Sequence, residues 1–280
     1  MIRAAFARGF RPSVVTNGWL LPQKLPQLRD AGLKSLIISL DAPEVEAHER
    51  NRGLKGVCER IRDANARMRD WKMKSVASVT INKLIGDFRA LPGFLRSLGF
   101  DTVTFSYPKR ARLGTSSLVY SETSSLIDYT PDELARAFGE VEALKREMPV
   151  ANPSESLADM VRHLRGTKEN FPCYGGLKYF YMDYDYNVFR CDSWNGKMCT
   201  VWDFATAPLI RDGCTACMSD CYRDSSVYLH LAVSIGDAVG QLKKGRLGKA
   251  AAALATRNNW RSVKSLLEGK RALSRMMRAK

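Results

Sequence analysis

Four short apolar runs, each with a helical segment nearby in the chain, constrain the fold more than any other feature of this sequence. The expected strands cover residues 12–18, 34–41, 75–82 and 101–108. Helices are expected over residues 2–8, 22–31, 57–71 and 88–98, where apolar residues recur at helical spacing or Gly closes the segment. Because strands and helices alternate, the pattern predicts a parallel sheet with right-handed crossovers, and therefore an α/β fold.

Small polar residues follow these strands, at the edge where ligands bind in parallel sheets. The candidates are Asn17, Ser39, Asp41, Thr80 and Asn82. They have two interpretations. They line a binding pocket, or they make the ordinary caps and turns that Asp and Asn favour at such positions. The sequence leaves both open.

The second half of the chain has a different character. Residues 109–129 are expected to form a loop, and Thr130 followed by Pro131 and Glu133 predicts a helix start. Further helices are expected over 154–165, 226–244 and from 247 onward, with an aromatic hairpin over 178–190. The predicted segments are a partial barrel (1–110), linker and helices (111–170), a cysteine-rich domain (171–225) and a basic helical tail (226–280).

Six of the seven cysteines lie between residues 173 and 221, and such clustering indicates a metal site, a disulfide framework or a redox pair. No secretory signal is recognised in the first residues, so we expect a reducing, cytoplasmic compartment, which disfavours disulfides. Spacing alone does not decide between zinc and an iron–sulfur cluster. Cys58 is expected to be a buried apolar residue, and the three histidines to be surface or core residues. The candidate ligands are Cys173, Cys191, Cys214, Cys217 and Cys221, with Cys199 as a spare.

The C-terminal tail carries most of the net charge of +15. Residues 222–280 contain 13 Lys and Arg residues against 3 acidic ones. The tail is therefore expected either to present a solvated helical surface or to face an anionic membrane surface or an acidic partner. Nucleic acid is a weaker expectation, because Trp260 is the one aromatic residue beyond residue 230. No apolar run is long enough to span a membrane, and a location peripheral to the membrane is compatible with the tail.

The ordered motifs resemble the radical SAM superfamily. The matching segments are 14–18, 36–41, His48, Arg52 with Gly53, and 79–82, which resemble that family's third to fifth barrel strands. The cysteine-rich region resembles the SPASM or twitch extension, in which a hairpin and a Cys-x2-Cys group hold an auxiliary [4Fe–4S] cluster. Tyr186 stands where the hairpin of that extension usually has Gly.

Two parts of the family pattern are absent from this sequence. The Cys-x3-Cys-x2-Cys loop and the Gly-Gly-Glu-Pro segment do not occur. The chain therefore resembles an N-terminally truncated radical SAM protein, and we expect no cleavage of S-adenosylmethionine by it. The alternative is a non-catalytic, zinc-stapled binding protein with a basic tail.

The resemblance implies a partial parallel (β/α) barrel of radical SAM type, followed by a small cysteine-rich α+β extension and a helical basic tail. Its full-length form would cleave S-adenosylmethionine to a 5′-deoxyadenosyl radical and abstract hydrogen from a peptide, protein or lipid substrate. An electron donor such as a flavodoxin or ferredoxin is implied. Carried over to this chain, the residues near S-adenosylmethionine are Asn17, Ser39, Asp41, Arg52, Thr80 and Asn82.

Overall fold

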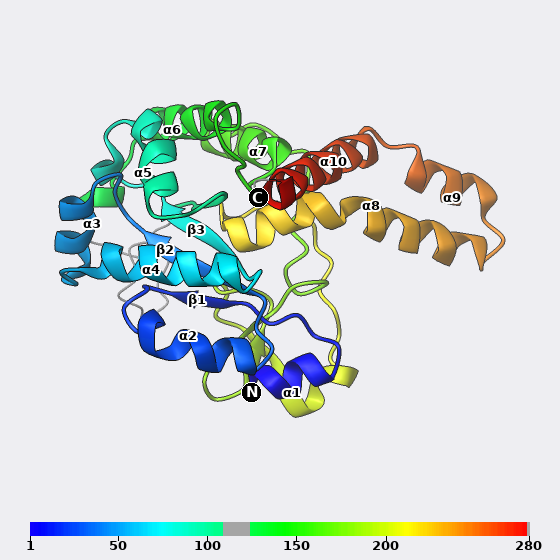
Figure 1. Cartoon of the computed structure of the whole chain (residues 1–280). Coiled ribbons are helices and arrows are strands. Elements are labelled where there is room, and N and C mark those ends of the chain that lie inside the picture. The colour runs from blue at the N-terminus through cyan, green and yellow to red at the C-terminus, as the bar shows by residue number, and fades with distance from the viewer. Residues whose placement is uncertain (109–123, 279–280) are drawn as a thin grey trace. The chain divides into compact units, whose positions relative to one another are not determined.

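The computed structural model describes residues 1–108 and 124–278, with side chains as far as residue 270 (Figure 1). It contains two compact units. Unit 1 comprises Met1–Ser106, Glu140–Ala151 and Ala272–Lys280, and unit 2 comprises Tyr107–Gly139 and Asn152–Arg271. The four segments expected from the sequence stay a prediction.

Unit 1 is built on a parallel four-stranded sheet, so the predicted α/β class is confirmed (Figure 1). Its strands follow chain order: β1 Val14–Thr16, β2 Ser35–Leu40, β3 Lys74–Thr80 and β4 Val103–Ser106. A parallel bridge from Val103 to Val150 adds one more contact beyond β4. The described residues show an open sheet rather than a closed barrel, and the barrel stays a prediction.

Helices follow the strands as the sequence pattern predicts. They are α1 Ile2–Ala7, α2 Leu21–Asp30, α3 Val45–Arg52, α4 Val57–Asp70 and α5 Leu91–Ser97, with short 3-10 turns at Lys83–Ile85 and Phe88–Ala90. In α4 the apolar residues Val57, Ile61 and Met68 share one face and are fully buried. Helix α3 was not predicted, because its sequence is largely polar.

Gly18 is required where β1 leads into α2. Its φ is +89°, and a Cβ added there would lie 2.5 Å from Cγ1 of Ile61. The turn therefore needs both the left-handed backbone and the missing side chain of glycine. This close approach sets α4 against the turn that follows β1.

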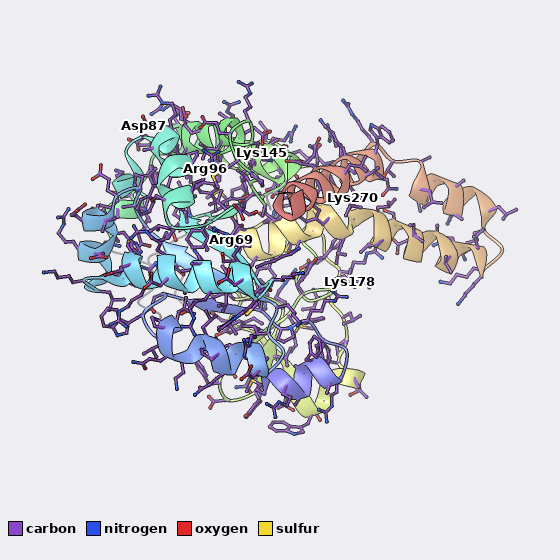
Figure 2. The ribbon with its side chains drawn as sticks, viewed as in Figure 1. Arg69, Asp87, Arg96, Lys145, Lys178 and Lys270 are labelled. Atoms are coloured by element: carbon purple, nitrogen blue, oxygen red, sulfur yellow. The ribbon has the colours of Figure 1, made fainter. Side chains whose placement is uncertain are left out.

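Polar side chains bind loop carbonyls in unit 1. The amide of Asn65 donates to the carbonyl of Leu98 at 2.8 Å, which ties α4 to the end of α5. Arg96, on α5 (Figure 2), donates to the carbonyl of Glu147. These bonds satisfy carbonyl groups at the helix ends, which have no partner inside a helix.

The helices α6 Pro131–Leu144 and α7 Ser154–Leu164 begin within unit 2. The predicted start of α6 is confirmed as a reciprocal cap. The hydroxyl of Thr130 accepts from the Glu133 amide at 3.2 Å, and the Glu133 carboxylate accepts from the Thr130 amide at 2.7 Å. Residues 109–123, which belong to the predicted loop, lie outside the described residues, and a 3-10 turn at Ser125–Ile127 follows them.

The predicted hairpin is part of a three-stranded antiparallel sheet: β5 Tyr181–Met182, β6 Asn187–Phe189 and β7 Lys197–Thr200. The third strand was not predicted. At the turn, Tyr186 adopts φ +61°, so a tyrosine occupies the left-handed conformation that Gly takes most readily. Its ring packs edge-on against Trp202, in the 3-10 segment Val201–Thr206.

Three helices end the chain: α8 Asp220–Leu242, α9 Leu247–Leu254 and α10 Arg257–Arg278. Helix α8 begins six residues earlier than expected and so includes Cys221. The Ser262 hydroxyl of α10 donates to the Val227 carbonyl of α8 at 2.7 Å, and the two helices lie side by side (Figure 1). The segment from residue 247 onward, expected as one helix or a pair, forms the pair α9 and α10.

Candidate functional site

Three separate segments of unit 2 carry the cysteines that the sequence singled out. Cys173 lies in the loop before β5, Cys191 follows β6, and Cys214 and Cys217 lie in the loop before α8. Cys221 is exposed in the first turn of α8, and Cys58 is buried in unit 1 as predicted. All seven cysteines are reduced thiols.

The backbone around Cys173 is held in a tight turn. The Cys173 amide donates to the carbonyl of Cys214 at 2.9 Å, and the Gly175 amide donates to the Cys173 sulfur at 3.3 Å. Gly176 follows with φ +84°, and a Cβ there would lie 2.9 Å from Cβ of Arg190. Two glycines thus allow the Cys173 turn to lie against the backbone that carries Cys191.

Arg190 connects the three segments that carry the cysteines. Its buried guanidinium binds both carboxylate oxygens of Asp212, at 2.6 and 2.9 Å, and donates to the Gly175 carbonyl at 3.3 Å. Asp212 in turn accepts from the Cys214 amide at 3.1 Å. Because each contact reaches a different segment, Arg190 and Asp212 fix the loops that carry Cys173, Cys191 and Cys214.

The thiols influence one another electrostatically. Burial raises the pKa of Cys173 to about 11, the Gly175 amide opposes this rise, and Cys217, Cys214 and Cys191 add to it. Burial also raises the pKa of Cys191, against an amide hydrogen bond from Ser193, with further contributions that include Cys217. The thiols of Cys173 and Cys191 are therefore protonated at neutral pH in the absence of a cation that favours thiolates.

This donor set tests whether a metal centre suits the site. Four thiols and amide N–H groups aimed at sulfur are the chemistry of iron–sulfur and zinc–thiolate sites. Among the described residues, however, no group of three or more Cys, His, Asp or Glu side chains is arranged to hold a metal ion. The thiols are donors of the chemical type that such a metal centre needs. Ligation requires the loops that carry them to move closer together.

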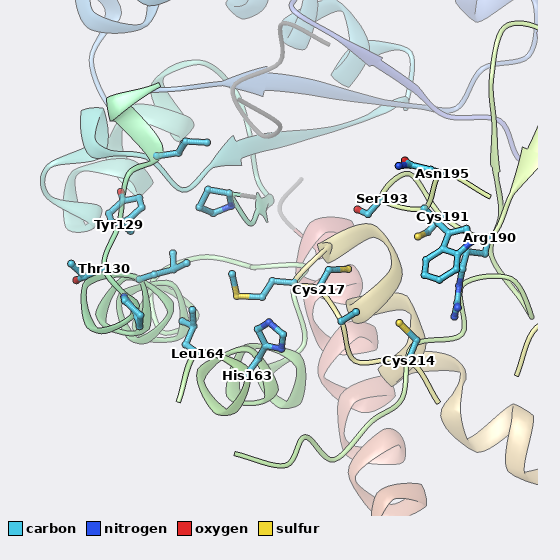
Figure 3. Close-up of a pocket in the computed structure, with 17 residues that line it drawn as sticks. Tyr129, Thr130, His163, Leu164, Arg190, Cys191, Ser193, Asn195, Cys214 and Cys217 are labelled. Carbon is cyan, nitrogen blue, oxygen red and sulfur yellow. The ribbon is translucent and has the colours of Figure 1, made fainter. Parts of the chain in front are cut away.

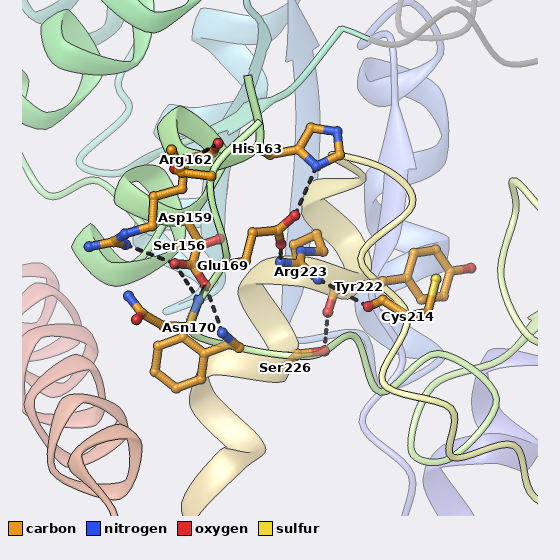
Figure 4. Close-up of polar contacts among 12 residues, drawn as sticks. Ser156, Asp159, Arg162, His163, Glu169, Asn170, Cys214, Tyr222, Arg223 and Ser226 are labelled. Atoms are coloured by element: carbon orange, nitrogen blue, oxygen red, sulfur yellow. Dashed lines mark hydrogen bonds and ion pairs between the residues drawn. The ribbon is translucent and has the colours of Figure 1, made fainter. Parts of the chain in front are cut away.

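A second buried charge pair lies behind the Cys214 loop (Figure 4). Arg223, on α8, forms an ion pair with Glu169, and both side chains are almost fully buried. Arg223 also donates to the Cys214 carbonyl at 3.4 Å. Burial lowers the pKa of Arg223, which measures the cost of enclosing this charge.

Glu169 also orients a histidine. Nδ1 of His163 lies 2.8 Å from the Glu169 carboxylate (Figure 4). Because the carboxylate is ionised beside Arg223, Nδ1 of the neutral ring is the donor, and Nε2 keeps its lone pair. Burial first, and Arg223 second, lower the pKa of His163. The ring is therefore neutral at physiological pH.

A cavity of about 590 Å³ lies beside the cysteines, within unit 2 (Figure 3). Three thiols and His163 form part of its wall, together with apolar side chains from the segment before α6 and from α7 and with mixed side chains from the two cysteine segments. The lining residues are Pro108, Ile127, Tyr129, Thr130, Pro131, Leu134, His163, Leu164, Arg190, Cys191, Ser193, Trp194, Asn195, Cys214, Ala216, Cys217 and Met218. The size and mixed polarity suit a small organic molecule or a peptide side chain.

The sheet edge of unit 1 brings together four of the six residues expected near S-adenosylmethionine. The buried Asp41 carboxylate binds the Arg52 guanidinium at 2.5 and 2.6 Å. Asn82 donates to the backbone carbonyls of Asp41, at 2.8 Å, and Thr80, at 2.7 Å. These groups satisfy one another, as the cap-and-turn interpretation expects.

The other residues at this edge are less connected to that group. The Asn17 side chain accepts from the Trp19 amide at 3.1 Å, which is a local turn contact. Ser39 is half-buried within β2, in register with Ser78 of β3. His48 is fully buried, and its Nδ1 accepts from the Asp41 amide at 3.2 Å.

The sequence did not identify the charged residues that organise the thiols. Arg190 is adjacent to Cys191, and Arg223 lies two residues after Cys221, so the local sequence marked their neighbourhood. Their partners, Asp212 and Glu169, are distant in the chain, and no local pattern pairs them.

Comparisons with known proteins add little. No protein-family model and no curated protein matches the chain. A solved structure described as "Native anSMEcpe with bound AdoMet" is similar, with 14% sequence identity and a TM-score of 0.45. The match covers 68% of this chain and 54% of that one, so the chain spans about half the length of that protein. No helix in the described part of the chain is long and apolar enough to cross a membrane.

Proposed function

We propose that unit 2 binds an iron–sulfur cluster through Cys173, Cys191, Cys214 and Cys217, and that a substrate occupies the adjoining cavity. One observation carries the proposal. Thiols from two separate segments, Cys191 and the loop with Cys214 and Cys217, line one cavity, and the Cys173 amide is bonded to the Cys214 carbonyl beside them. Backbone amides point at two of the sulfurs, those of Cys173 and Cys191. The electrostatic influence of Cys191, Cys214 and Cys217 on Cys173 supports this choice of four.

The side chains of unit 2 have separable roles in this proposal. When bound, the cluster supplies one-electron redox chemistry. Arg190 and Asp212 hold the ligand loops, and the Gly175 and Ser193 amides favour the thiolate form of Cys173 and Cys191. The apolar wall of the cavity excludes water from the substrate.

His163 is placed to accept a proton at Nε2 from a substrate in the cavity. Its Nδ1 is held by Glu169, and the ring lines the cavity. The lowered pKa keeps Nε2 available as an acceptor at neutral pH. A substrate that loses an electron and a proton fits this wall, where a one-electron centre and a proton acceptor would face the same space.

For unit 1 we propose the finer assignment that the resemblance implies, a site for S-adenosylmethionine at the carboxyl edge of the sheet. Asn17, Ser39 and Thr80 would contact the ligand, while Asp41 and Arg52 shape the edge through their own pair. The proposal includes membership of the radical SAM superfamily and an external one-electron donor such as a flavodoxin or ferredoxin. Since the sequence has no Cys-x3-Cys-x2-Cys motif, S-adenosylmethionine is expected to bind without being cleaved.

The proposal is tested by anaerobic reconstitution with iron and sulfide, followed by Fe, sulfide and Zn analysis. About four Fe per chain, with a thiolate-to-iron absorption band, is the expected result. Cys191→Ser is expected to abolish the band, while Cys221→Ser and the matched control Cys58→Ser retain it. One Zn with no stable iron would establish the alternative, a zinc-stapled binding unit.

Binding of S-adenosylmethionine is measured separately, by equilibrium dialysis with the labelled compound. Ser39→Val and Asn17→Ala are expected to weaken binding, and Lys34→Ala, an exposed change just before the opposite end of β2, is the control. Equal retention by all variants and by an unrelated protein would remove the unit 1 site. That outcome would leave the cluster proposal intact.

A further inference from the structure

The end of α8, the turn after it and α9 have an unusual charge distribution. Residues 238–255 contain four Lys and Arg residues and no Asp or Glu. Asp237, at the border of this stretch, is already paired with Arg211. The cations of the turn are all exposed: Lys243, Lys244, Arg246 and, at the start of α9, Lys249.

The same helices carry apolar side chains that remain exposed. On α8 they are Ile235, Val239 and Leu242, at spacings of four and three residues, and each is between 44% and 49% exposed. This spacing places them on one face of the helix. An apolar stripe therefore lies uncovered along the last turns of α8.

Helix α9 repeats the pattern. Leu247, Ala251 and Leu254 have the same spacing, and Leu247 is 71% exposed. On each helix a buried alanine stands three residues after the first member of the stripe: Ala238 on α8 and Ala250 on α9. The two stripes thus have the same offset from the buried face of their helix.

Because each stripe has the same offset from the buried face of its helix, the positions of the two stripes relative to each other can be inferred. Helices α8 and α9 pack together and are joined by a short turn, so they run antiparallel (Figure 1). Antiparallel helices that pack through equivalent positions carry equivalent stripes on the same side of the pair. The helical hairpin therefore has one apolar face, and its tip is cationic.

We infer that this hairpin docks on an anionic membrane surface, with its apolar face at the lipid boundary and Lys243, Lys244, Arg246 and Lys249 among the headgroups. Exposed leucines flanked by cations are typical of helices that lie in the membrane interface. The cations alone would suit a lipid surface or an acidic protein equally well. The exposed apolar face favours the lipid surface. Nucleic acid is disfavoured because residues 231–254, which carry the apolar face and the cations, contain no Phe, Trp or Tyr on which bases could stack.

Vesicle flotation of the whole chain tests the inference. Phosphatidylcholine vesicles with and without phosphatidylserine are the probes, and Lys243→Glu/Lys244→Glu is the first variant. We expect binding only to the anionic vesicles, weakened by salt, and reduced on the order of tenfold or more in the variant. Lys24→Glu/Lys55→Glu, which changes the net charge equally at exposed sites of unit 1, is expected to bind as the parent does.

A second variant separates docking from attraction by charge alone. Leu242→Ser/Leu247→Ser keeps every cation and is expected to lose most vesicle binding, with an unchanged circular dichroism spectrum. Equal binding by this variant would overturn the inference, and so would equal binding to neutral and anionic vesicles. Tighter binding to a labelled single-stranded RNA than to anionic vesicles, unaffected by the leucine changes, would assign the surface to nucleic acid instead.

Discussion

Glu169→Gln is expected to be among the most destabilising single changes in unit 2. The Glu169 and Arg223 side chains are 4% and 2% exposed, so the substitution leaves a guanidinium in the interior without its counter-charge. It also weakens the contact that orients His163. Removing one partner of a buried ion pair costs about 3–5 kcal/mol, because the remaining charge stays desolvated.

The magnitude is expected near the lower end of that range. Glutamine retains a carbonyl oxygen that can accept from Arg223, and the Cys214 carbonyl supplies a second acceptor at 3.4 Å. A loss of about 3 kcal/mol corresponds to a fall in Tm of roughly 6–12 °C for a unit of this size. Differential scanning calorimetry and urea unfolding followed by circular dichroism measure both quantities.

The matched control is the exposed ion pair of Arg29 with Asp30, whose side chains are 43% and 59% exposed. Arg29→Gln is expected to cost less than about 1 kcal/mol, since solvent screens both charges. If Glu169→Gln unfolds within about 1 kcal/mol of this control, the buried pair contributes no specific stability. The account of how Arg223 and Glu169 support the Cys214 loop would then be wrong.

Three further outcomes follow from the geometry. Burial raises the pKa of Asp224 to about 7, so the folded state binds a proton that the unfolded state releases near pH 4. Stability falls as pH rises across that interval, and Asp224→Asn removes the slope in unfolding curves measured from pH 4 to 7. In Gly176→Ala the new Cβ would lie 2.9 Å from Cβ of Arg190, and the alanine would have to adopt a left-handed backbone conformation. The free energy of unfolding, measured in urea, is expected to fall by about 1–3 kcal/mol, and Fe binding is expected to be lost. Thr130→Ala removes half of the reciprocal cap with Glu133 and costs about 1 kcal/mol in the same assay.

Local patterns predicted most of the elements. The apolar run of β2 indicates a strand because six residues are too few for a typical helix, and the stripe of α4 indicates a helix because its apolar residues recur at helical spacing. Helix α3 and strand β7 were missed for a common reason. The sequence of α3 is mainly charged, and β7 is four residues long, so packing rather than periodicity stabilises them.

The residue types of the candidate sites were predictable from the sequence, but the contacts between those residues were not. Cysteine clustering located the thiols beside the cavity, and strand ends located the edge of the sheet. The pairs of Arg190 with Asp212 and of Glu169 with Arg223 depend on contacts between distant segments, which no single-sequence pattern encodes. A charged residue beside a cysteine is the one local signal that pointed toward them.

The two candidate sites differ in how much of their hydrogen-bonding capacity and charge remains available to a ligand. At the sheet edge, the Asp41 carboxylate and Arg52 guanidinium satisfy each other, so much of the local hydrogen-bonding capacity is already used. In unit 2 the buried charges also cancel in pairs. Burial raises the pKa of Cys191, and the Arg190 guanidinium beside it only opposes that rise. Burial also raises the pKa of Cys173 to about 11. A further cation would favour the thiolate form of both, and the proposed cluster would supply it. The raised pKa values of these thiols therefore add a physical argument to cysteine spacing for the proposed location of the cofactor.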